Sequence, residues 1–340
     1  MKSTPYIQHV GKVIETGGKF THVMAVALDP ISNYKEGIIR CITSREGDVT
    51  VSGYVDRSEI WKIKGDSLEK FSITELLKIS GTEEIIHDLS SENLEFIGFE
   101  DPDIFVDEIK NLTHIYFTLP FLNKKEKHAL VHLGHAVGKN LDSLVMTEPV
   151  LLGNSKTYAG AKEVSIAPIN SRGLRLNLFE SSKKEADFTY SIIQVAVVED
   201  MSKPWKSGDI VFHPKEHNIP WIGGHASPGP LLPKSFIDIG EGKVLGIMNG
   251  REANQKVGDQ TKYGMFSVGL FIYDYENGKI DWVSPEPLIQ DTEAVTITFA
   301  SQFIETKAGE GILYAHVDDS FVRAYTLFAD GIKQQLPVLQ

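Results

Sequence analysis

The chain has 340 residues, 41% of them hydrophobic and 24% charged, so it is long enough to bury a large core and is not disordered over its length. Its formal net charge of −12 argues against binding to a nucleic-acid backbone, which requires lysine and arginine, and favours a neutral or cationic ligand. The single cysteine, Cys41, excludes an internal disulfide, a thiolate zinc site and a CxxC redox pair.

The same features limit location and partners. No run of about 18 apolar residues predicts a membrane span, and Met1 to Gly18 hold no apolar stretch of the kind found in a secretory signal. We therefore expect a cytoplasmic protein with no nucleic-acid partner, no membrane partner and no cofactor. Association into a homo-oligomer stays open, since no coiled-coil segment is visible.

Short strand-like segments recur along the chain. They are rich in β-branched and aromatic residues and are separated by Gly, Asn, Asp, Ser and Pro, which is typical of strands joined by turns. In order they are FTHVMAVAL (20–28), EGIIRCITS (36–44), THIYFTLPF (113–121), KHALVHLGHAV (127–137), GLRLNLFE (173–180), SIIQVAVVE (191–199), KVLGIMNG (243–250), MFSVGLFIYD (265–274), AVTITFASQFIE (294–305), GILYAHV (311–317) and RAYTLFAD (323–330). The sequence therefore predicts an all-β protein.

Two segments depart from this pattern. SITELLKI (72–79) begins with a serine cap and has Glu75 three residues on, a capping-box pattern that predicts a helix of about two turns. ESSKKEAD (180–187) is a polar run of both signs, which predicts a solvated loop.

The strands group into modules of roughly 60 residues. They lie near 20–75, 94–150, 158–206, 219–282 and 292–335. Five four-stranded modules arranged radially would form a five-bladed β-propeller, a closed arrangement that leaves few exposed sheet edges, and we predict one such domain over residues 1–340. A pair of β-sandwiches would need a linker that is not visible, and a β-helix would need a much shorter repeat.

Several short motifs lack the neighbouring residues or elements that their usual function requires. On a strand, His128 and His132 share one face and His135 lies on the other, so no metal site is expected. GGHASPGP (223–230) has His225 where the nucleophile elbow of a serine hydrolase needs glycine. GEGKVLG (240–246) is not followed by a helix, as a dinucleotide fingerprint requires.

Acidic residues are the remaining candidates for chemistry. They gather beside strands in four different modules: Glu100, Asp101 and Asp103 in GFEDPDIF, Asp56 and Glu59 with Arg57 in YVDRSE, Glu163 with Lys162 in GAKEVS, and Asp318 and Asp319 in AHVDDS. Taken by itself, each cluster predicts a turn. In a propeller, however, the innermost strands bring such residues together at the axis, and converging carboxylates supply the acid and base that glycoside cleavage needs.

These segments resemble glycoside hydrolase family 130, the β-mannoside phosphorylases and hydrolases. EDPDIFVDEIKNLTHIYFTLPF (100–121) is similar to the family's EDPR segment and the strand after it. WIGGHASPGPLLP, KVLGIMNG, KYGMFSVGLFIYD and ILYAHVDDSFVRAYT are similar to the family's IGAGPPPI, WLLIYHGV, YRLGAALLD and YYGAADTVIGLAT segments, in the same order. The resemblance spans most of residues 94–330 and implies a five-bladed propeller with the reacting sugar over the axis.

The resemblance also implies residue roles. The EDPR aspartate, the family's general acid, matches Asp101, and the YGAAD aspartate matches Asp318, a second acid or sugar ligand. Three cations that help the phosphorylases bind phosphate are missing, because Asp103, Asn249 and Glu180 occupy their positions. Their loss removes charge-assisted hydrogen bonds to a dianion, although Lys162, Arg251 and His225 leave a different anion site open.

We therefore expect an enzyme that hydrolyses a β-mannoside or related glycoside, with phosphorolysis disfavoured. Asp101 is the expected general acid, with Asp318 or Glu100 as the water-activating carboxylate and Asp103 tuning Asp101 by like charge. The expected substrate-binding set is Asp56, Asp103, Lys162, His225, Asn249, Arg251 and Tyr263, and Trp221 and Tyr314 are further candidates to stack on a sugar. A non-catalytic sugar-binding propeller and a protein-binding scaffold are the alternatives.

Overall fold

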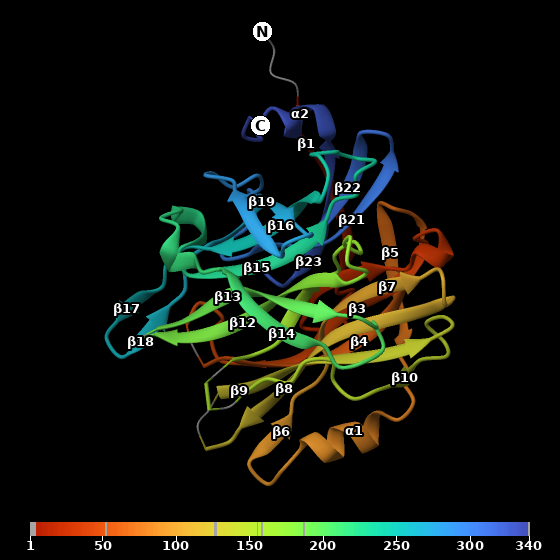
Figure 1. The fold of residues 1–340 in the computed structure, drawn as a ribbon. Helices are drawn as coiled ribbons and strands as arrows, with labels where there is room; N and C mark the ends of the chain where they lie inside the picture. The colour runs from red at the N-terminus through yellow and green to blue at the C-terminus, as the bar shows by residue number, and fades with distance from the viewer. Residues whose placement is uncertain are drawn as a thin grey trace.

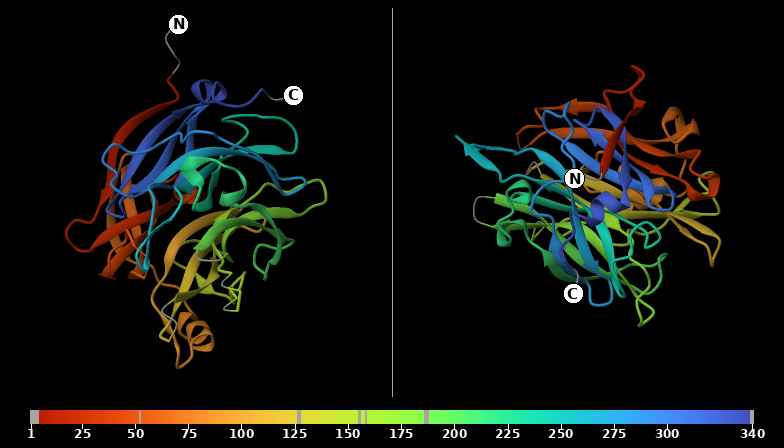
Figure 2. Two further views of the ribbon diagram at one scale, coloured as in Figure 1. Left: turned by 90° about the vertical axis from the view of Figure 1, so that its left-hand side faces the viewer. Right: turned by 90° about the horizontal axis from the view of Figure 1, so that it is seen from above.

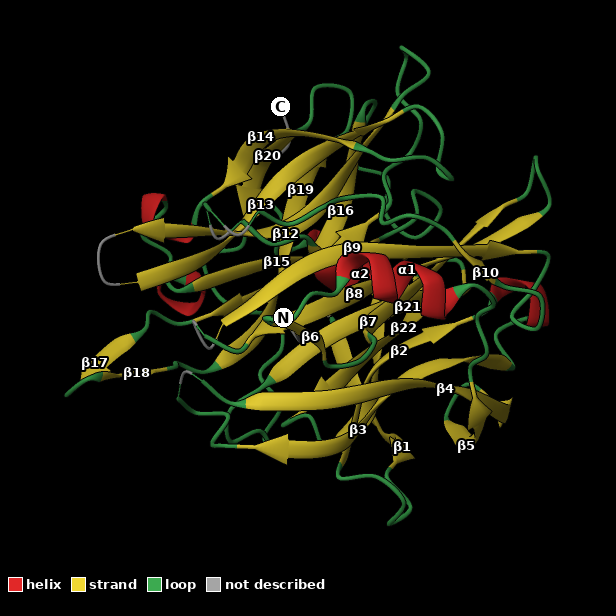
Figure 3. Cartoon of the chain, turned by 90° about the horizontal axis from the view of Figure 1, so that it is seen from below, coloured by secondary structure: helices red, strands yellow, loops and turns green. Residues whose placement is uncertain are grey.

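The computed structural model describes residues 5–51, 53–125, 128–154, 156–157, 159–185 and 188–338. Most of these residues lie in strands, and the helices among them are short, as the yellow and red segments of Figure 3 show. The all-β class predicted from the sequence is confirmed. No helix within the described ranges combines the length and apolar character needed to cross a bilayer.

The first sheet is antiparallel and follows chain order, β2-β3-β4-β5. Its strands are β2 (His22–Leu28), β3 (Glu36–Glu46), β4 (Val55–Ser67) and β5 (Lys70–Leu76), and the 3-10 helix η1 (Pro30–Ser32) joins the first two. The helix predicted over 72–79 is therefore wrong. Phe71 and Ile73 pack into the core beside β4, and this burial outweighs the local capping signal.

The second sheet is built around β8 and β9. It contains β6 (Leu94–Phe96), β7 (Glu100–Asp107), β8 (Leu112–Asn123), β9 (His128–Gly138) and β10 (Val145–Met146), with both β6 and β7 paired to β8. The helix α1 (Thr82–Leu89) precedes it and is drawn to the right of β6 at the bottom of Figure 1. Ile85, Ile86 and Leu89 attach this helix, which was not predicted, to the core.

The third sheet has eight strands and divides naturally in the middle. Its first part holds β11 (Lys162–Ser165), β12 (Arg175–Glu185), β13 (Phe188–Val198) and β14 (Lys206–Phe212), and its second part holds β15 (His225–Leu231), β16 (Lys243–Arg251), β19 (Phe266–Asp274) and β20 (Lys279–Val283). A single parallel pair, Ser191 with His225, connects the two parts. The 3-10 helices η2 (Pro214–Glu216) and η3 (Pro220–Ile222) lie between them.

The solvated loop predicted over 180–187 is also wrong for its described part. Residues 180–185 continue β12, which pairs with β13 from Arg175–Val198 to Glu185–Phe188, and residues 186–187 lie outside the described ranges. Glu180 is almost fully buried. A charged residue in this strand is tolerated because it has partners inside the protein, described below.

The last sheet joins the two ends of the chain, which lie on the same side of the molecule in Figure 2. It contains β21 (Thr298–Lys307), β22 (Glu310–Val317), β23 (Phe321–Phe328) and β1 (Ile7–Glu15), in the order β1-β23-β22-β21. The helix α2 (Ala329–Lys333) follows β23. A separate hairpin, β17 (Gln255–Val257) and β18 (Gln260–Lys262), projects from the end of β16 (Figure 1).

Buried apolar side chains fill the contacts between these strand groups. The clusters join, in turn, the first sheet to the second, the second to β11–β14, β11–β14 to β15–β20, β15–β20 to the last sheet, and the last sheet to the first. Trp221 and Tyr314 belong to this core: the Trp221 indole donates to the Ser284 carbonyl, and the Tyr314 hydroxyl donates to the Leu68 carbonyl. The prediction that they stack on a sugar is therefore wrong.

One strand of each group carries an irregularity at a corresponding place. Register shifts occur at Ala25 in β2, Asp101 in β7, Glu163 in β11, Gly229 in β15 and Ser301 in β21. All five residues line one cavity of about 180 Å³. A β-bulge bends its strand and redirects a side chain, so these bulges decide which groups reach the cavity.

Candidate functional site

Two of the bulges bring carboxyl groups together. Asp101 and Glu163 both have φ values of +45°, a left-handed conformation that is uncommon for residues with a side chain. Backbone strain of this kind costs about 1–3 kcal/mol and gathers at functional sites. The two carboxyl groups form a hydrogen bond with each other, although they belong to different sheets.

A close backbone approach positions the Asp101 strand. Gly98 forms a parallel bridge with Ser58 of β4, with a φ of +127°. A Cβ atom on Gly98 would lie 2.0 Å from the Ser58 carbonyl oxygen, so only glycine fits there. This contact sets Glu100 and Asp101 against the first sheet.

Arg40 of β3 holds both acids. Its Nη2 donates to Glu100 Oε1 at 2.6 Å, its Nη1 donates to Asp101 Oδ1 at 2.8 Å, and its Nε donates to Ser58 Oγ at 2.9 Å. The side chains of Arg40 and Asp101 are less than a tenth exposed. Buried charges are stable only when paired, and the guanidinium fork matches this pair of carboxylates.

Burial and the local charges shift the pKa values of three neighbouring acids in different directions. Glu100, Asp101 and Glu163 face two cations, Arg40 and Lys162. Burial, together with Asp101, raises the pKa of Glu163 well above its usual value and so favours its protonated form, in which it donates to Asp101. Burial opposes the ionisation of Asp101, but Arg40 and Lys162 outweigh it and lower its pKa. Burial raises the pKa of Glu100 to about 7.

A second buried group adjoins this one. Glu180 of β12 lies 3.4 Å from Lys162 Nζ, and it accepts from His225 Nε2 at 3.1 Å. Burial opposes its charge, but His225 and Lys162 lower the pKa of Glu180 to about 2, so it is ionised. Burial lowers the pKa of His225 to about 4, so its ring is neutral at pH 7. Lys162 therefore connects Glu180 to the Asp101 pair.

Arg251 lies at the edge of this second group. Its guanidinium group lies 4.1 Å from the Tyr263 ring centroid and 5.1 Å from the Phe266 ring centroid. The His225 ring meets the Phe266 ring edge to face. Tyr263 also donates its backbone N–H to the Thr50 carbonyl, which connects the β17–β18 side of the site to the loop after β3.

A third group closes the site on the side of the last sheet. Arg45 binds both oxygens of Asp56 at 2.7 Å and reaches Asp319 Oδ2 at 3.3 Å. Asp319 Oδ1 lies 3.4 Å from His316 Nε2. Asp56 is therefore fully engaged with Arg45, which argues against its predicted role as a free sugar ligand.

Asp318 does not have the role predicted for it. Its carboxylate accepts the backbone N–H groups of Val295, Thr296 and Ile297 and the Thr296 hydroxyl. Burial opposes its ionisation, and these donors outweigh it and lower its pKa. A carboxylate saturated in this way anchors the 295–297 loop and is not available to activate water.

The predicted contact between Asn249 and a sugar is also wrong. Asn249 is completely buried. Its Nδ2 donates to the Ala300 carbonyl at 2.9 Å, and its Oδ1 accepts the Ala300 N–H at 2.8 Å. The side chain therefore joins β16 to β21 as a backbone would, and both ends of its amide are occupied.

Replacing Asn249 with leucine is expected to destabilise the fold by about 2–6 kcal/mol, because both Ala300 backbone groups lose their partners and each buried orphan costs about 1–3 kcal/mol. Urea unfolding measures the loss, with Asn277→Ala, which removes an exposed asparagine, as the control. A stable Asn249→Leu protein with a raised KM for its substrate would instead support a sugar-binding role.

Asp103, two residues after Asp101, also lines the cavity. Burial raises its pKa to about 7, while its Oδ1 accepts the Ile104 N–H at 2.9 Å. The charges that chiefly set the pKa of Asp101 are those of Arg40 and Lys162. The predicted tuning of Asp101 by Asp103 therefore has no support.

Two of the three histidines of β9, His132 and His135, serve the fold. His132 Nδ1 accepts the Gly153 N–H, and His135 lies between His114 and Thr147 at 2.9 and 2.8 Å. The described residues contain no group of three or more His, Cys, Asp or Glu side chains placed to hold a metal ion.

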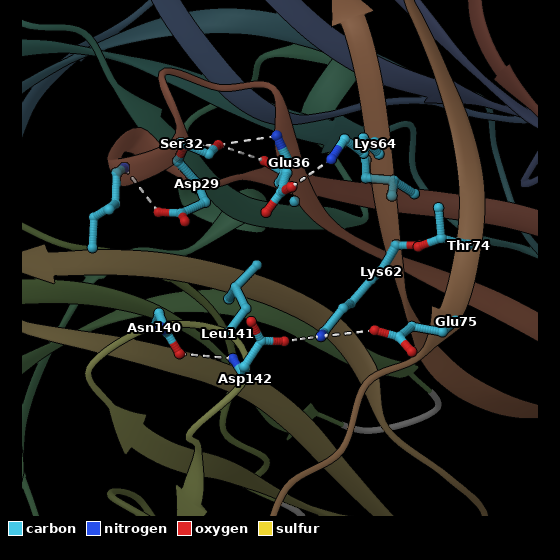
Figure 4. A pocket seen from close by; sticks show the side chains of 13 residues that line it. Asp29, Ser32, Glu36, Lys62, Lys64, Thr74, Glu75, Asn140, Leu141 and Asp142 are labelled. Carbon is cyan, nitrogen blue, oxygen red and sulfur yellow. Dashed lines mark hydrogen bonds and ion pairs between the residues drawn. The ribbon is translucent and has the colours of Figure 1, made fainter.

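A larger hollow of about 500 Å³ lies elsewhere, between β4 and the loop at 140–142 (Figure 4). Lys62 donates to Glu75 at 3.0 Å and to Asp142, and Lys64 pairs with Glu36 at 3.1 Å. Its cations are thus neutralised by neighbouring acids. We assign the site to the smaller cavity, where strained acids and shifted pKa values coincide.

Sequence reasoning missed several members of the site. Arg40 was the visible signal, a lone charge inside the apolar run EGIIRCITS. In the sequence, Glu163 stands beside Lys162 without a predicted role, and Glu180 falls in the run that predicts a solvated loop. Of the predicted residues, the structure brings together Glu100, Asp101, Lys162, His225 and Arg251, with Tyr263 at the rim.

No protein-family model and no curated protein matches the sequence. Solved structures do match it. β-1,2-Mannobiose phosphorylase from Listeria innocua has a TM-score of 0.62 at 12% identity, over 98% of this chain and 94% of that one. MPT-4, a mannose phosphorylase from Leishmania mexicana in complex with phosphate ion, has a TM-score of 0.57 at 12% identity, and the match covers 99% of this chain and 92% of that one. The Bacillus subtilis arabinanase Arb43A has a TM-score of 0.52 at 9% identity, and the match covers 92% of this chain and 96% of that one. At the level of the fold, these likenesses confirm the relationship that the motifs predicted.

Proposed function

We propose that the chain is a glycoside-active enzyme that hydrolyses a β-mannoside or a related glycoside, built as a single five-bladed β-propeller domain over residues 1–340. The five bulged strands that line one cavity support five blades. So does the succession of apolar clusters, which returns from the last sheet to the first. The eight-stranded sheet then counts as two blades joined at the Ser191–His225 pair.

The observation that carries the proposal is the hydrogen-bonded pair of Glu163 and Asp101, whose pKa values are shifted in opposite directions. Glycoside cleavage needs a carboxylic acid that is still protonated near neutral pH, to protonate the leaving oxygen. Glu163 meets this need because burial raises its pKa. We therefore propose Glu163 as the proton donor and Asp101 as the ionised partner that holds its proton in place, which revises the general-acid role that the family resemblance implies for Asp101.

Glu100 is the best candidate to activate water. Burial raises its pKa to about 7, and a general base works best when its pKa is near the working pH. Its side chain is 16% exposed, more than that of Asp101. Of the two carboxylates predicted for this step, Asp318 is occupied by backbone donors, and Glu100 remains.

Hydrolysis is favoured over phosphorolysis by Glu180. Its buried carboxylate already takes up Lys162 and His225, two of the three groups predicted to form an alternative anion site. A phosphate dianion there would meet a negative charge in a low-dielectric interior, where like charges repel strongly. The acidic replacements at the cationic positions of the related phosphorylases point the same way.

Turnover of a panel of aryl and disaccharide β-mannosides, with related glycosides, tests the proposal. We expect release of free sugar at a rate that does not increase when inorganic phosphate is added. Sugar phosphate as the main product would contradict hydrolysis. Binding of the same glycosides without any turnover would favour the non-catalytic sugar-binding propeller.

A further inference from the structure

One buried cation in the site has no counter-ion of its own. The Arg251 side chain forms no hydrogen bond or ion pair with any described residue, and its Nε is buried without a partner. Arg251 is 8% exposed. Burial lowers its pKa, yet a guanidinium group stays charged at any physiological pH. An uncompensated buried charge is costly, so its retention here calls for a function.

No hydrogen bond or ion pair from a described residue occupies the donors of Arg251. Tyr263 lies against the guanidinium group at 4.1 Å from the ring centroid, and Phe266 lies 5.1 Å away. Contacts with aromatic faces stabilise the cation but use none of its five N–H donors, which point outward in the plane of the group. These donors are suited to a planar oxyanion.

Lys162 is shared by Glu180 and the acids around Asp101, whereas Arg251 has no ion pair with a described carboxylate. Lys162 and Arg251 are cationic, Glu180 is anionic, and His225 is neutral. Lys162 is paired with Glu180 at 3.4 Å, so Arg251 is the cation left over in this group. One free cation suits a monoanion better than a dianion, and the flat guanidinium fork binds a carboxylate through two parallel hydrogen bonds.

We propose that Arg251 forms a subsite for an oxyanion of the substrate, and that the substrate is a glycoside carrying a sugar carboxylate, as in a uronic acid. The inference rests on the proposed function and names its substrate class. Lys162 interacts electrostatically with Asp101 and with Glu180, and Glu180 interacts in the same way with Arg251, so the Arg251 group adjoins the proposed reacting pair. The net charge of −12 predicted a neutral or cationic ligand, but the local charge at Arg251 has the opposite sign.

Calorimetric binding to the full chain tests the subsite without requiring turnover. Glucuronate and mannuronate are compared with glucose and mannose, and inorganic phosphate is a separate arm at equal ionic strength. We expect each uronate to bind about 10- to 100-fold more tightly than its neutral sugar, the range of a hydrogen-bonded charge pair. Arg251→Gln should remove this preference, Arg251→Lys should keep part of it, and Arg172→Gln, which changes an exposed arginine outside the site, should leave it intact.

Each other outcome has a defined meaning. Equal binding of uronates and neutral sugars, or a preference that survives Arg251→Gln, overturns the subsite. Phosphate binding that Arg251→Gln abolishes, with no uronate preference, assigns the group to a free anion instead. Arg251→Gln should unfold at the same or higher urea concentration than the wild type, because it removes an unpaired buried charge. Turnover of uronate-bearing glycosides unaffected by Arg251→Gln sinks the subsite alone, whereas uronate binding with no turnover of any glycoside sinks the proposed hydrolysis alone.

Discussion

Replacing Glu163 with glutamine is expected to lower kcat by about 10²- to 10⁴-fold on glycosides with poor leaving groups, the usual contribution of a positioned general acid. The amide keeps the shape of the side chain but has no acidic proton to give to the departing oxygen. Steady-state kinetics on alkyl glycosides or disaccharides measures the loss. KM should change much less than kcat, because the proton is needed in the transition state rather than for binding.

Leaving-group chemistry separates this role from a structural one. A dinitrophenolate leaves without protonation, so Glu163→Gln should retain much more of the wild-type rate on a dinitrophenyl glycoside than on an alkyl glycoside. Asp101→Asn is the matched control at the other half of the pair. Equal losses on both substrates in Glu163→Gln would contradict the proton-donor assignment, and an undiminished rate in Glu163→Gln would remove Glu163 from the mechanism.

Replacing Arg40 with methionine is expected to cost about 3–5 kcal/mol of unfolding free energy at pH 8, because it leaves Glu100 and Asp101 buried without their cation. Arg40 helps to lower the pKa of Asp101 in the folded protein. That stabilisation is present above the unfolded pKa of an aspartate, about 3.9, and is lost as the pH falls. Without Arg40 the two acids become hard to ionise, so the variant should lose less stability at pH 5 than at pH 8.

Urea unfolding at the two pH values measures this difference. Arg172→Met, at an exposed arginine, is the control and should change stability by less than about 0.5 kcal/mol. If Arg40→Met does not fold at pH 8, Arg40→Lys keeps one charge and should fold with an intermediate loss. An equal loss at both pH values would show that packing rather than charge explains the role of Arg40.

Local pattern predicted the strands because their signal is short in range. The segments that form β3, β8, β16 and β22 either alternate apolar and polar residues or are apolar over several consecutive residues. The composition of each segment alone is therefore enough to predict its strand. The helix predicted at 72–79 shows the limit of such signals. Its sequence matches the capping-box pattern, but the apolar contacts of Phe71 and Ile73 with distant strands favour a strand there.

The chemical roles depended on long-range contacts. Asn249 and Asp318 were reasonable ligands by motif, yet their polar atoms are taken up by the backbone of Ala300 and of the 295–297 loop. Glu180 begins a polar segment whose composition predicts a solvated loop. In the structure it is buried between Lys162 and His225. Spacing in the chain carries no information about these partners.

By itself the sequence determined the all-β class, the places of most strands, the resemblance to mannoside-active enzymes and the importance of GFEDPDIF. Only the tertiary structure decided which acids meet and which of them keeps a proton. Asp101 and Glu163 are distant in the chain, and their contact requires two bulged strands from different sheets to converge beside Arg40. Protonation follows from burial and from the sum of nearby charges, and both quantities exist only once the chain is folded.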